Sequence, residues 1–504
     1  MPFYSAQERS DFRWSLPATK IQRMNGSALP DYNTIMRKRR IGWLPLAALI
    51  LAIGISLIYY WSIPQVLEVS PSQNATAVQA GASIRVRFSR PMQHGGVESR
   101  LVTDPPRRGN FSWEENTLTF TPDQPWGSGE TVQVRLEPGA RSTGLLSMAL
   151  RHGLSWTFTV RQPLLAYLYP SDASADIYLL DPSNGEITRL TDAPGTIMDY
   201  SVSLDGSVIY FNTEQGDGGS SIYGLNRNSG ESRLLLECPG ALCRYPQISP
   251  GGDFLAYERT DLSSPVRLNL PQVWLLPLSQ DTSDGAPLPI GEPRLVAPPA
   301  HRTQQPQWNS TGLLSFYDYQ RSAFIVQEPQ GREIAQFPSQ TGIPGAWHPD
   351  AEHYVFPEIY TNEISNPNTL PNLEAIQNSH LLQFSLDGSQ KDLTGSDDVE
   401  DTSPAFSPDG KTLAFGRKFL DLVRWTPGRQ LWLMGADGSQ GRAVTNDPDY
   451  NHYDMTWSPD GVHLAYVRFN KNSLIDPPEL WLMNADGSGA TRLISGGYSP
   501  QWLP

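Results

Sequence analysis

Apolar and polar residues alternate along many short stretches of the chain, and the clearest of these stretches occur twice near the C-terminus. FSPDGKTLAFGR (406–417) and LWLMGADGSQGRAVT (431–445) return as WSPDGVHLAYVR (457–468) and LWLMNADGSGATRLI (480–494). Each copy contains two strands of period two and two Asp-Gly turns, because glycine supplies the positive φ that such turns need. A period of roughly 50 residues built only from short antiparallel strands predicts propeller blades.

The same pattern recurs in weaker form from residue 163 onwards. Apolar strands followed by a turn recur seven times, at 177–191, 222–236, 273–278, 323–337, 381–394, 431–445 and 480–494. Strands that open a unit recur six times, at 201–211, 246–259, 306–318, 346–358, 406–417 and 457–468. A further opening motif, SPQWLP (499–504), has nothing after it.

This mismatch predicts how the ring closes. The first unit, 164–192, lacks an opening strand, and 499–504 supplies an opening strand that lacks a unit. Pairing the two removes two free sheet edges. The sequence therefore predicts a propeller over residues 163–504 that is closed by the C-terminal strand, with seven blades favoured and six or eight as alternatives.

The segment 64–162 shows alternation of the same kind without the repeat. Its predicted strands are 83–89, 117–122, 130–137 and 155–160, each bounded by Gly, Pro or Asn. About 100 residues with this spacing indicate a β-sandwich. The protein is therefore expected to be all-β outside its N-terminal region.

Two family resemblances rest on these residues. The segment 64–162 resembles the SbsA-type bacterial Ig-like domain, through Pro71, Gly81-Ala82, FSRPM (88–92), TLTFTPDQPWGSGETVQVRL (117–136) and FTV (158–160). This resemblance implies a spacer or adhesive module without chemistry of its own. The segment 163–504 resembles the WD40-like propeller repeat of TolB-type proteins, whose pattern is P-x-[FW]-SPDG-x-x-[IL]-A-[FY] followed by [IL]-W-[LV]-M-x-x-D-G.

The N-terminal region is organised differently. Residues 1–36 are polar and lack periodicity, which predicts a disordered tail on the cytoplasmic side. The basic run 37–40 then precedes the uncharged, apolar stretch 41–63, which is long enough to span a bilayer as a helix. Cations before the span predict a cytoplasmic N-terminus and an extracytoplasmic remainder, in a bacterial cell membrane. A cleaved signal peptide is the alternative, but no small-x-small cleavage site follows the apolar run.

The distribution of charged residues along the chain bears on which partners the protein can bind. Residues 1–62 hold eight basic and three acidic residues, which leaves 30 basic and 49 acidic residues, a net −19, for 63–504. An acidic body of this kind is a poor partner for nucleic acid. Only two cysteines occur, Cys238 and Cys243, in a loop between two predicted blades. They can form a small surface disulfide if the region is exported, and two thiols alone cannot complete a zinc site.

Motifs for catalysis are missing from the sequence. It contains no G-x-S-x-G nucleophile turn, no H-E-x-x-H pair and no phosphate-binding glycine loop. His348, His353, His452 and His463 lie in or beside predicted strands and turns, where hydrogen-bonded structural histidines are expected. No catalytic or cofactor-binding residue is therefore predicted.

Acidic residues before the last two repeats are the candidates for a metal site. Asp398, Asp401, Asp449 and Asp454 fall on loops that a propeller places near its central channel, where oxygen ligands can bind Ca²⁺. Solvated acidic loops are the competing interpretation, because no EF-hand spacing fixes the geometry.

Two hypotheses for function follow. The first is a membrane-anchored binding or scaffold protein, without enzymatic activity, that recognises a protein, peptide or glycan outside the cell through the channel-face loops. The second is an exported lyase or glycoside hydrolase that uses channel carboxylates, which requires two carboxyl groups roughly 5–10 Å apart.

Overall fold

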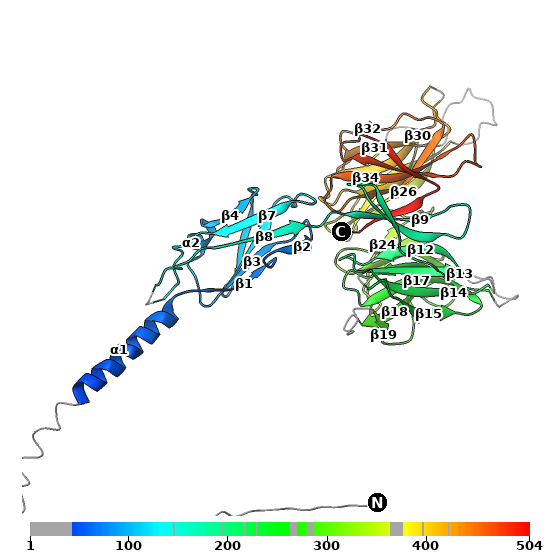
Figure 1. Ribbon diagram of the computed structural model, residues 1–504. Coiled ribbons are helices and arrows are strands. Elements are labelled where there is room, and N and C mark those ends of the chain that lie inside the picture. The colour runs from blue at the N-terminus through cyan, green and yellow to red at the C-terminus, as the bar shows by residue number, and fades with distance from the viewer. Residues whose placement is uncertain are drawn as a thin grey trace, which may run out of the picture. The chain divides into compact units, whose positions relative to one another are not determined.

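The computed structural model describes residues 43–144, 147–193, 195–214, 218–227, 229–262, 270–279, 287–362, 376–395, 398–421 and 423–503 (Figure 1). The predicted tail 1–36 and the basic run 37–40 lie outside these residues. The chain divides into two compact units, which meet between Pro64 and Gln65.

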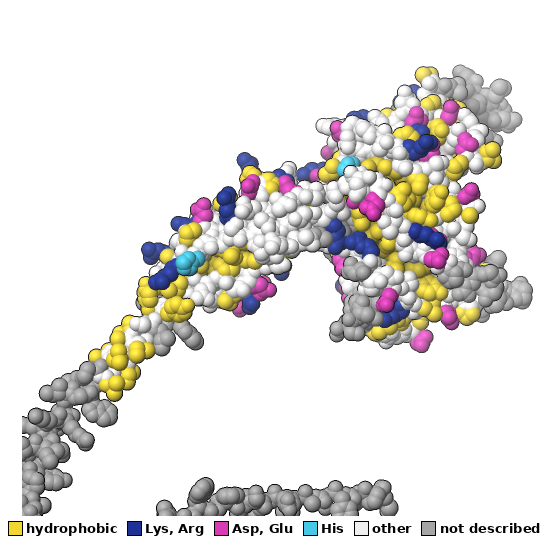
Figure 2. Space-filling view, viewed as in Figure 1, with side chains coloured by type: hydrophobic (Ala, Val, Ile, Leu, Met, Phe, Trp, Pro, Cys, Tyr) yellow, Lys and Arg dark blue, Asp and Glu magenta, His cyan; other side chains and the backbone are white. Residues whose placement is uncertain are grey.

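The apolar stretch at the N-terminus forms helix α1 (Trp43–Ser62). Apolar side chains cover its described surface, as the yellow atoms along the helix in Figure 2 show. The exposed ones are Leu46, Leu49, Ile50, Leu51, Ile53, Ile55, Tyr59 and Tyr60. Among the described residues, no helix combines the length and the apolar character that crossing a membrane requires.

The first β-domain is a sandwich of two four-stranded sheets, as the spacing of its strands predicted. One sheet has the order β1 (Val66–Ser70), β3 (Ile84–Phe88), β6 (Thr117–Pro122), β5 (Gly109–Glu114). The other has the order β2 (Ala75–Val78), β8 (Leu154–Val160), β7 (Thr131–Leu136), β4 (Leu101–Asp104). A short helix, α2 (His94–Glu98), lies between β3 and β4 in the chain.

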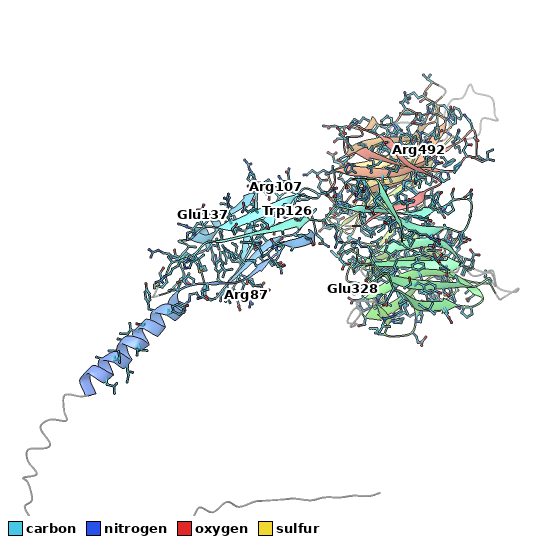
Figure 3. All side chains as sticks on the ribbon, in the orientation of Figure 1. Arg87, Arg107, Trp126, Glu137, Glu328 and Arg492 are labelled. Carbon is cyan, nitrogen blue, oxygen red and sulfur yellow. A yellow bond between two sulfur atoms is a disulfide. The ribbon has the colours of Figure 1, made fainter. Side chains whose placement is uncertain are left out.

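Alternation along these strands builds the core of the sandwich. In β3, Ile84, Val86 and Phe88 are buried while the arginines between them are exposed. Trp126, labelled in Figure 3, is fully buried, and its indole N–H donates to the carbonyl oxygen of Ala82 at 2.8 Å. The two inner faces therefore form one hydrophobic core.

The second β-domain is an array of antiparallel sheets. Its first two sheets have the orders β11 (Glu186–Arg189), β10 (Asp176–Asp181), β9 (Leu164–Tyr169), β37 (Tyr498–Leu503), and β12 (Thr196–Val202), β13 (Val208–Glu214), β14 (Ser220–Asn226), β15 (Ser232–Cys238). The third has the order β16 (Ala241–Ile248), β17 (Phe254–Asp261), β18 (Gln272–Ser279), β19 (Leu288–Pro289), with β20 (Arg294–Leu295) also paired to β18. The fourth has the order β21 (Thr303–Trp308), β22 (Leu314–Asp318), β23 (Ala323–Gln327), β24 (Glu333–Pro338).

The remaining sheets contain the strongest repeats. An eight-stranded sheet holds β25 (Ala346–Trp347), β26 (His353–Asn362), β27 (Ile376–Ser385) and β28 (Gln390–Asp392), joined to β29 (Val399–Phe406), β30 (Thr412–Phe419), β31 (Gln430–Gly435) and β32 (Arg442–Ala443). The parallel pairing of β27 with β29, at Ser379 and Glu400, connects its halves. The last sheet has the order β33 (Tyr450–Trp457), β34 (His463–Asn470), β35 (Glu479–Asn484), β36 (Thr491–Ser495).

The array closes in the way predicted from the missing opening strand of its first unit. The C-terminal strand β37 pairs antiparallel with β9, with Trp502 opposite Leu165 and Leu503 opposite Leu164. A hydrophobic cluster joins this first sheet to the last one, through Leu165, Trp502 and Val467. The prediction of closure by the C-terminal strand is thus confirmed, and the fold is a β-propeller.

The Asp-Gly turns have the structural role expected of them. Asp409 Oδ1 accepts hydrogen bonds from Ser407 Oγ at 2.7 Å and from the Lys411 backbone N–H at 3.1 Å. Gly410 follows with φ of 70°. These contacts are those of an Asx turn, so the repeated SPDG motif shapes a hairpin.

Candidate functional site in the propeller channel

The inner strands of the propeller share an irregularity at one position. In β16, β21, β29, β33 and β37 the ladder with the next strand shifts register in mid-strand. Inside each shift lies a residue other than glycine with positive φ: Tyr245 (50°), Gln305 (61°), Ser403 (54°), Asp454 (49°) and Ser499 (51°). Proline follows four of the five; it has no N–H to donate, so it is tolerated where the ladder is interrupted.

A positive φ at a residue other than glycine is a strained conformation, and it recurs on five inner strands. A residue other than glycine in the left-handed region costs of the order of 1–3 kcal/mol and persists only where its surroundings enforce it. A bulge also re-aims the side chain of the extra residue. Three of the five, Ser403, Asp454 and Ser499, line one pocket, which favours the channel as the functional region.

A pocket with a volume of about 470 Å³ lies where three of these bulges meet, those at Ser403, Asp454 and Ser499. Its lining comes from inner-strand segments of the fourth sheet, both halves of the eight-stranded sheet, the last sheet and the closing strand: Gln307, Ile343, Pro344, Gly345, Thr402, Ser403, Pro404, Asp454, Met455, Ser499, Pro500 and Gln501. Segments from so many sheets can share one pocket only around the axis of the ring. This pocket is the candidate site.

Asp454 is the ionisable side chain of the pocket lining. Burial within the ring raises the pKa of its carboxyl group to about 6, although part of its surface stays open to the water of the channel. Within the described residues, its carboxylate makes no hydrogen bond or ion pair. Asp454 therefore offers an unoccupied acceptor when ionised and a donor when protonated.

A second acid with a raised pKa lies beside one of the bulges. Burial raises the pKa of Glu258 to about 7, and the nearby Asp199 carboxylate adds to the rise. The backbone N–H of Gln305 donates to Glu258 Oε1 at 2.6 Å and opposes the shift. Asp199 itself is paired with Arg244 at 3.0 Å.

The closing strand holds one wall of the pocket in place. Tyr200 donates from its hydroxyl group to the carbonyl oxygen of Ser499 at 2.7 Å. In return, the amide group of Gln501 donates to the carbonyl oxygen of Tyr200 at 2.7 Å. Closure of the ring and formation of the pocket are therefore coupled.

The four carboxylates predicted as calcium ligands have separate surroundings. Asp401 is fully buried and forms a two-pronged ion pair with Arg417, with both N···O distances 2.8 Å. Asp398 accepts a hydrogen bond from Asn378 at 3.1 Å, and Asp454 lines the pocket. Among the described residues, these three and Asp449 do not converge on a common set of ligand atoms, so calcium binding by them stays a prediction.

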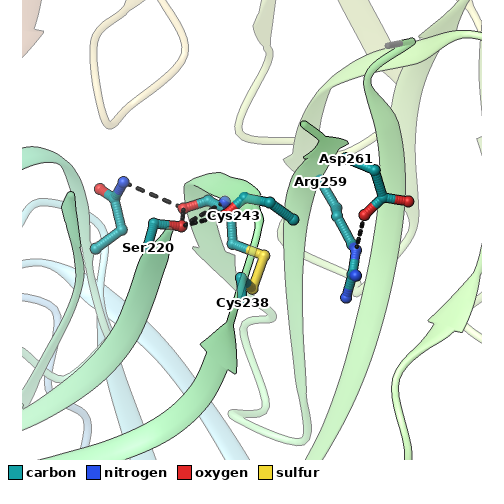
Figure 4. The surroundings of a disulfide bond; sticks show 7 residues. Ser220, Cys238, Cys243, Arg259 and Asp261 are labelled. Carbon is teal, nitrogen blue, oxygen red and sulfur yellow. Dashed lines mark hydrogen bonds and ion pairs between the residues drawn. A yellow bond between two sulfur atoms is a disulfide. The ribbon is translucent and has the colours of Figure 1, made fainter. Parts of the chain in front are cut away.

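The two cysteines lie close together at the start of the third sheet. Cys238, at the end of β15, and Cys243, in β16, form a disulfide (Figure 4). Ser220 anchors the same hairpin, since its hydroxyl oxygen accepts a hydrogen bond from the Cys243 N–H at 2.6 Å. Both sulfur-bearing side chains are buried, so the disulfide belongs to the core between two sheets.

The histidines divide into two kinds. His452 is buried, its Nδ1 donates to the carbonyl oxygen of Arg429 at 2.8 Å, and burial lowers its pKa to about 4, as suits a structural histidine. His348 and His353 instead converge with Asp350, and their ligand atoms all lie within 4.8 Å of one another. Sequence reasoning missed this group because it treated each histidine singly, although the spacing H-x-D-x-x-H was visible.

Comparison with known proteins covers the two β-domains separately. The family model of the bacterial Ig-like domain matches residues 62–160. Dipeptidyl-peptidase 5 of Porphyromonas gingivalis is 37% identical over 63 residues, which are 12% of this chain and 9% of that protein.

Solved structures that resemble the chain include propellers of different kinds. TolB from Acinetobacter baumannii aligns with 88% of this chain and 99% of its own, at 11% identity and a TM-score of 0.40. A prolyl endopeptidase aligns with 66% of this chain and 49% of its own, at 13% identity and a TM-score of 0.45. This chain thus spans about half of that endopeptidase.

Proposed function

We propose that the protein is a membrane-anchored, extracytoplasmic binding or scaffold protein that recognises a protein, peptide or glycan through the channel face of its propeller. The observation that carries this proposal is the pocket of about 470 Å³ at the ring axis. Its volume falls in the range of ligand sites, roughly 300–1,000 Å³.

The chemistry of the pocket lining supports a polar ligand. Thr402, Ser403 and Ser499 supply hydroxyl groups, Gln307 and Gln501 supply amide groups, and Asp454 supplies one carboxyl group. Groups of this kind exchange hydrogen bonds with peptide amides or sugar hydroxyls. Strained bulges on a rigid ring hold them in position before the ligand arrives, which lowers the entropic cost of binding.

The membrane anchor is part of the same proposal. Its support is the sequence 37–63, with four cations before an uncharged run, and the exposed apolar side chains of α1. Such a surface is unfavourable in water and favourable in lipid. An anchor at this point would keep the acidic remainder of the chain, net −19 after residue 62, outside the cytoplasm.

Seven blades are also proposed for the ring. Dividing the eight-stranded sheet at the single parallel bridge between Ser379 and Glu400 leaves two four-stranded halves. Hydrophobic clusters then lie between each sheet and the next and return to the first sheet, which supports seven units around the axis.

A pocket-blocking variant tests the binding proposal. The full chain, purified in detergent, is screened against peptide libraries and glycan arrays, and each ligand found is titrated against Ser403→Tyr. A tyrosine at this bulge fills the pocket, so the affinity should fall by at least about tenfold, or 1.4 kcal/mol. Ser389→Tyr, at an exposed hairpin position, is the matched control and should leave the affinity unchanged.

Equal binding by both variants would place the ligand elsewhere on the molecule and refute the proposal. A screen without any ligand would refute it as well.

A second function, that of an exported lyase or glycoside hydrolase, is supported by Asp454, whose carboxyl group lines the pocket and has its pKa raised to about 6 by burial. General acids are carboxyl groups of this kind. Product formation from a bound glycan, lost in Asp454→Asn while binding persists, would favour the enzyme.

A further inference from the structure

One turn of the propeller departs from its sister turns at three positions. In the last two repeats the turn reads Ser407-Pro408-Asp409-Gly410-Lys411-Thr412 or Ser458-Pro459-Asp460-Gly461-Val462-His463. Between β25 and β26 it reads His348-Pro349-Asp350-Ala351-Glu352-His353. His348 thus replaces the serine of both other turns, His353 stands where one of them also has a histidine, and the aspartate is kept.

The hairpin is retained in spite of these changes. Ala351 adopts φ of 63°, where the sister turns have Gly410 and Gly461 at 70°. The His348 N–H still donates to the carbonyl oxygen of His353 at 2.8 Å. The backbone therefore keeps the shape of the sister turns, and the side chains it presents differ.

The carboxylate of Asp350 is fixed by the backbone. Its Oδ1 accepts hydrogen bonds from the N–H groups of Glu352, at 2.8 Å, and His353, at 3.2 Å. Oδ2 is left to face the two rings, at 2.9 Å from His348 Nδ1 and 2.7 Å from His353 Nδ1.

The imidazole ring of His348 is oriented by the other half of the eight-stranded sheet. Its Nε2 lies 2.8 Å from the carbonyl oxygen of Gly410, which can only accept, so Nε2 carries the proton. A Cβ at position 410 would lie 2.6 Å from Nε2, so this approach needs the glycine. The ring also packs edge-on against Phe406, with centroids 4.9 Å apart.

This orientation leaves a mismatch at the other nitrogen. In a neutral ring with Nε2 protonated, Nδ1 carries a lone pair, and the Asp350 N–H points at it from 3.2 Å. Asp350 Oδ2 lies 2.9 Å from the same nitrogen. Two electron-rich atoms at this distance repel each other unless a proton or a metal ion lies between them.

We propose that His348 Nδ1, His353 Nδ1 and Asp350 Oδ2 bind one divalent transition-metal ion of the zinc, nickel and copper class. Two imidazoles and a carboxylate are ligands for these metals, whereas calcium and magnesium prefer oxygen alone. The contact from Nε2 to the Gly410 carbonyl is the outer-shell hydrogen bond that metal-binding histidines make. The side chains of His348, Asp350 and His353 stay 21%, 35% and 31% exposed, so water can complete the coordination.

A bound metal would join two halves of the eight-stranded sheet. His348 and His353 lie at β25 and β26, and the carbonyl that orients His348 belongs to the turn before β30. The site is therefore suited to a structural or regulatory metal that stiffens this part of the ring. The inference does not depend on the function proposed for the channel.

Metal titration of the full chain tests the site. The protein carries a tag without histidine, is treated with a chelator, and is titrated with Zn²⁺ by calorimetry. Wild type should bind one equivalent. His353→Thr, which installs the residue of the sister turn at 412, should weaken binding by roughly 100-fold or more, because even outer-shell changes cost about 10–100-fold.

Two further variants complete the test. His348→Ser with His353→Thr installs the serine and threonine that begin and end the turn 407–412 in this same chain, and should abolish the site. His463→Thr changes the histidine at the equivalent position of the last repeat, where Ser458 replaces His348, and should bind Zn²⁺ as wild type does.

A measurement on wild type alone keeps the test independent of variant folding. Co²⁺ should produce a visible absorption spectrum of four- or five-coordinate geometry with nitrogen and oxygen ligands, and excess Ca²⁺ should not displace it. A spectrum unchanged from aqueous Co²⁺, or equal Zn²⁺ affinity in wild type and the double variant, would overturn the proposal.

Discussion

Trp502 is the residue at which closure of the ring can be tested most sharply. Its side chain is 8% exposed and packs with Leu165, Val467 and Leu480, which belong to the first and last sheets. Its indole N–H donates to the carbonyl oxygen of Thr456 at 3.0 Å. One side chain from the last residues of the chain thus connects two sheets that are separated by the whole propeller sequence.

The magnitude follows from burial and from this hydrogen bond. Replacing a buried tryptophan by alanine removes about 3–5 kcal/mol of stability, and the lost hydrogen bond adds about 1 kcal/mol. Since water can reach the site once the indole side chain is removed, we expect Trp502→Ala to lower the free energy of unfolding by about 4 kcal/mol. If the free energy of unfolding falls by about 3 kcal/mol or more per molar urea, the urea midpoint of unfolding falls by roughly 1 M.

Two measurements on the full chain in detergent check this. Urea unfolding followed by far-UV circular dichroism gives the midpoint, and hydrogen exchange reports the amides of β9, which pair with β37. Trp425→Ala is the matched control, since Trp425 is 53% exposed and its loss should change stability by less than about 1 kcal/mol. A midpoint shift no larger than that of the control, with β9 amides still protected, would show that β37 does not hold the ring closed.

Three further predictions concern ionisable groups and the disulfide. Asp401→Asn leaves the Arg417 side chain, 10% exposed, without its ionic partner. The free energy of unfolding measured in urea should therefore fall by about 3–5 kcal/mol, and adding Arg417→Met to Asp401→Asn should recover most of this loss. An Asp401→Asn variant as stable as wild type would contradict the buried ion pair. The pKa of Asp454 is about 6 in the fold against an ordinary 3.8, so its contribution to stability is full below pH 3.8 and is lost as the pH rises through 6. Asp454→Asn should therefore raise the free energy of unfolding at pH 7.5 by about 1 kcal/mol after solvent screening, seen as a higher melting temperature, and much less at pH 4.5. An equal effect at both pH values would argue against the raised pKa. Cys238→Ser with Cys243→Ser opens a short loop and should lower the free energy of unfolding by about 2 kcal/mol. The difference in stability from wild type should shrink under reducing conditions. A difference that persists unchanged would show that the loss comes from packing of the sulfur atoms.

Local patterns in the sequence predicted much of the fold. The alternation in 406–417 and 457–468 appears as β30 and β34 with their preceding turns, and the unpaired SPQWLP motif appears as β37 against β9. The sandwich strands 117–122 and 130–137 lie within one residue of β6 and β7. These features could be predicted because period-two burial and turn chemistry act between residues that are close in the chain.

The sites depend on what the ring brings together. Asp454 was a candidate by position alone, and its raised pKa and open carboxylate come from packing in the channel. Asp401 was a candidate of the same kind, and the fold pairs it with Arg417. Neighbouring side chains on adjacent strands decide which carboxylate has an ionic partner and which has none. The sequence pattern does not encode these neighbours.

By itself, the sequence determined the repeat, the strands, the closing segment and the all-β class, because each follows from spacing within some 50 residues. Only the tertiary structure decided that three of the five strained bulges, at Ser403, Asp454 and Ser499, line one pocket and that the Gly410 carbonyl orients His348 toward Asp350. Contacts of this kind join sheets that are distant in the chain. Their geometry depends on register, bulges and closure together, so it exists only once the ring has formed.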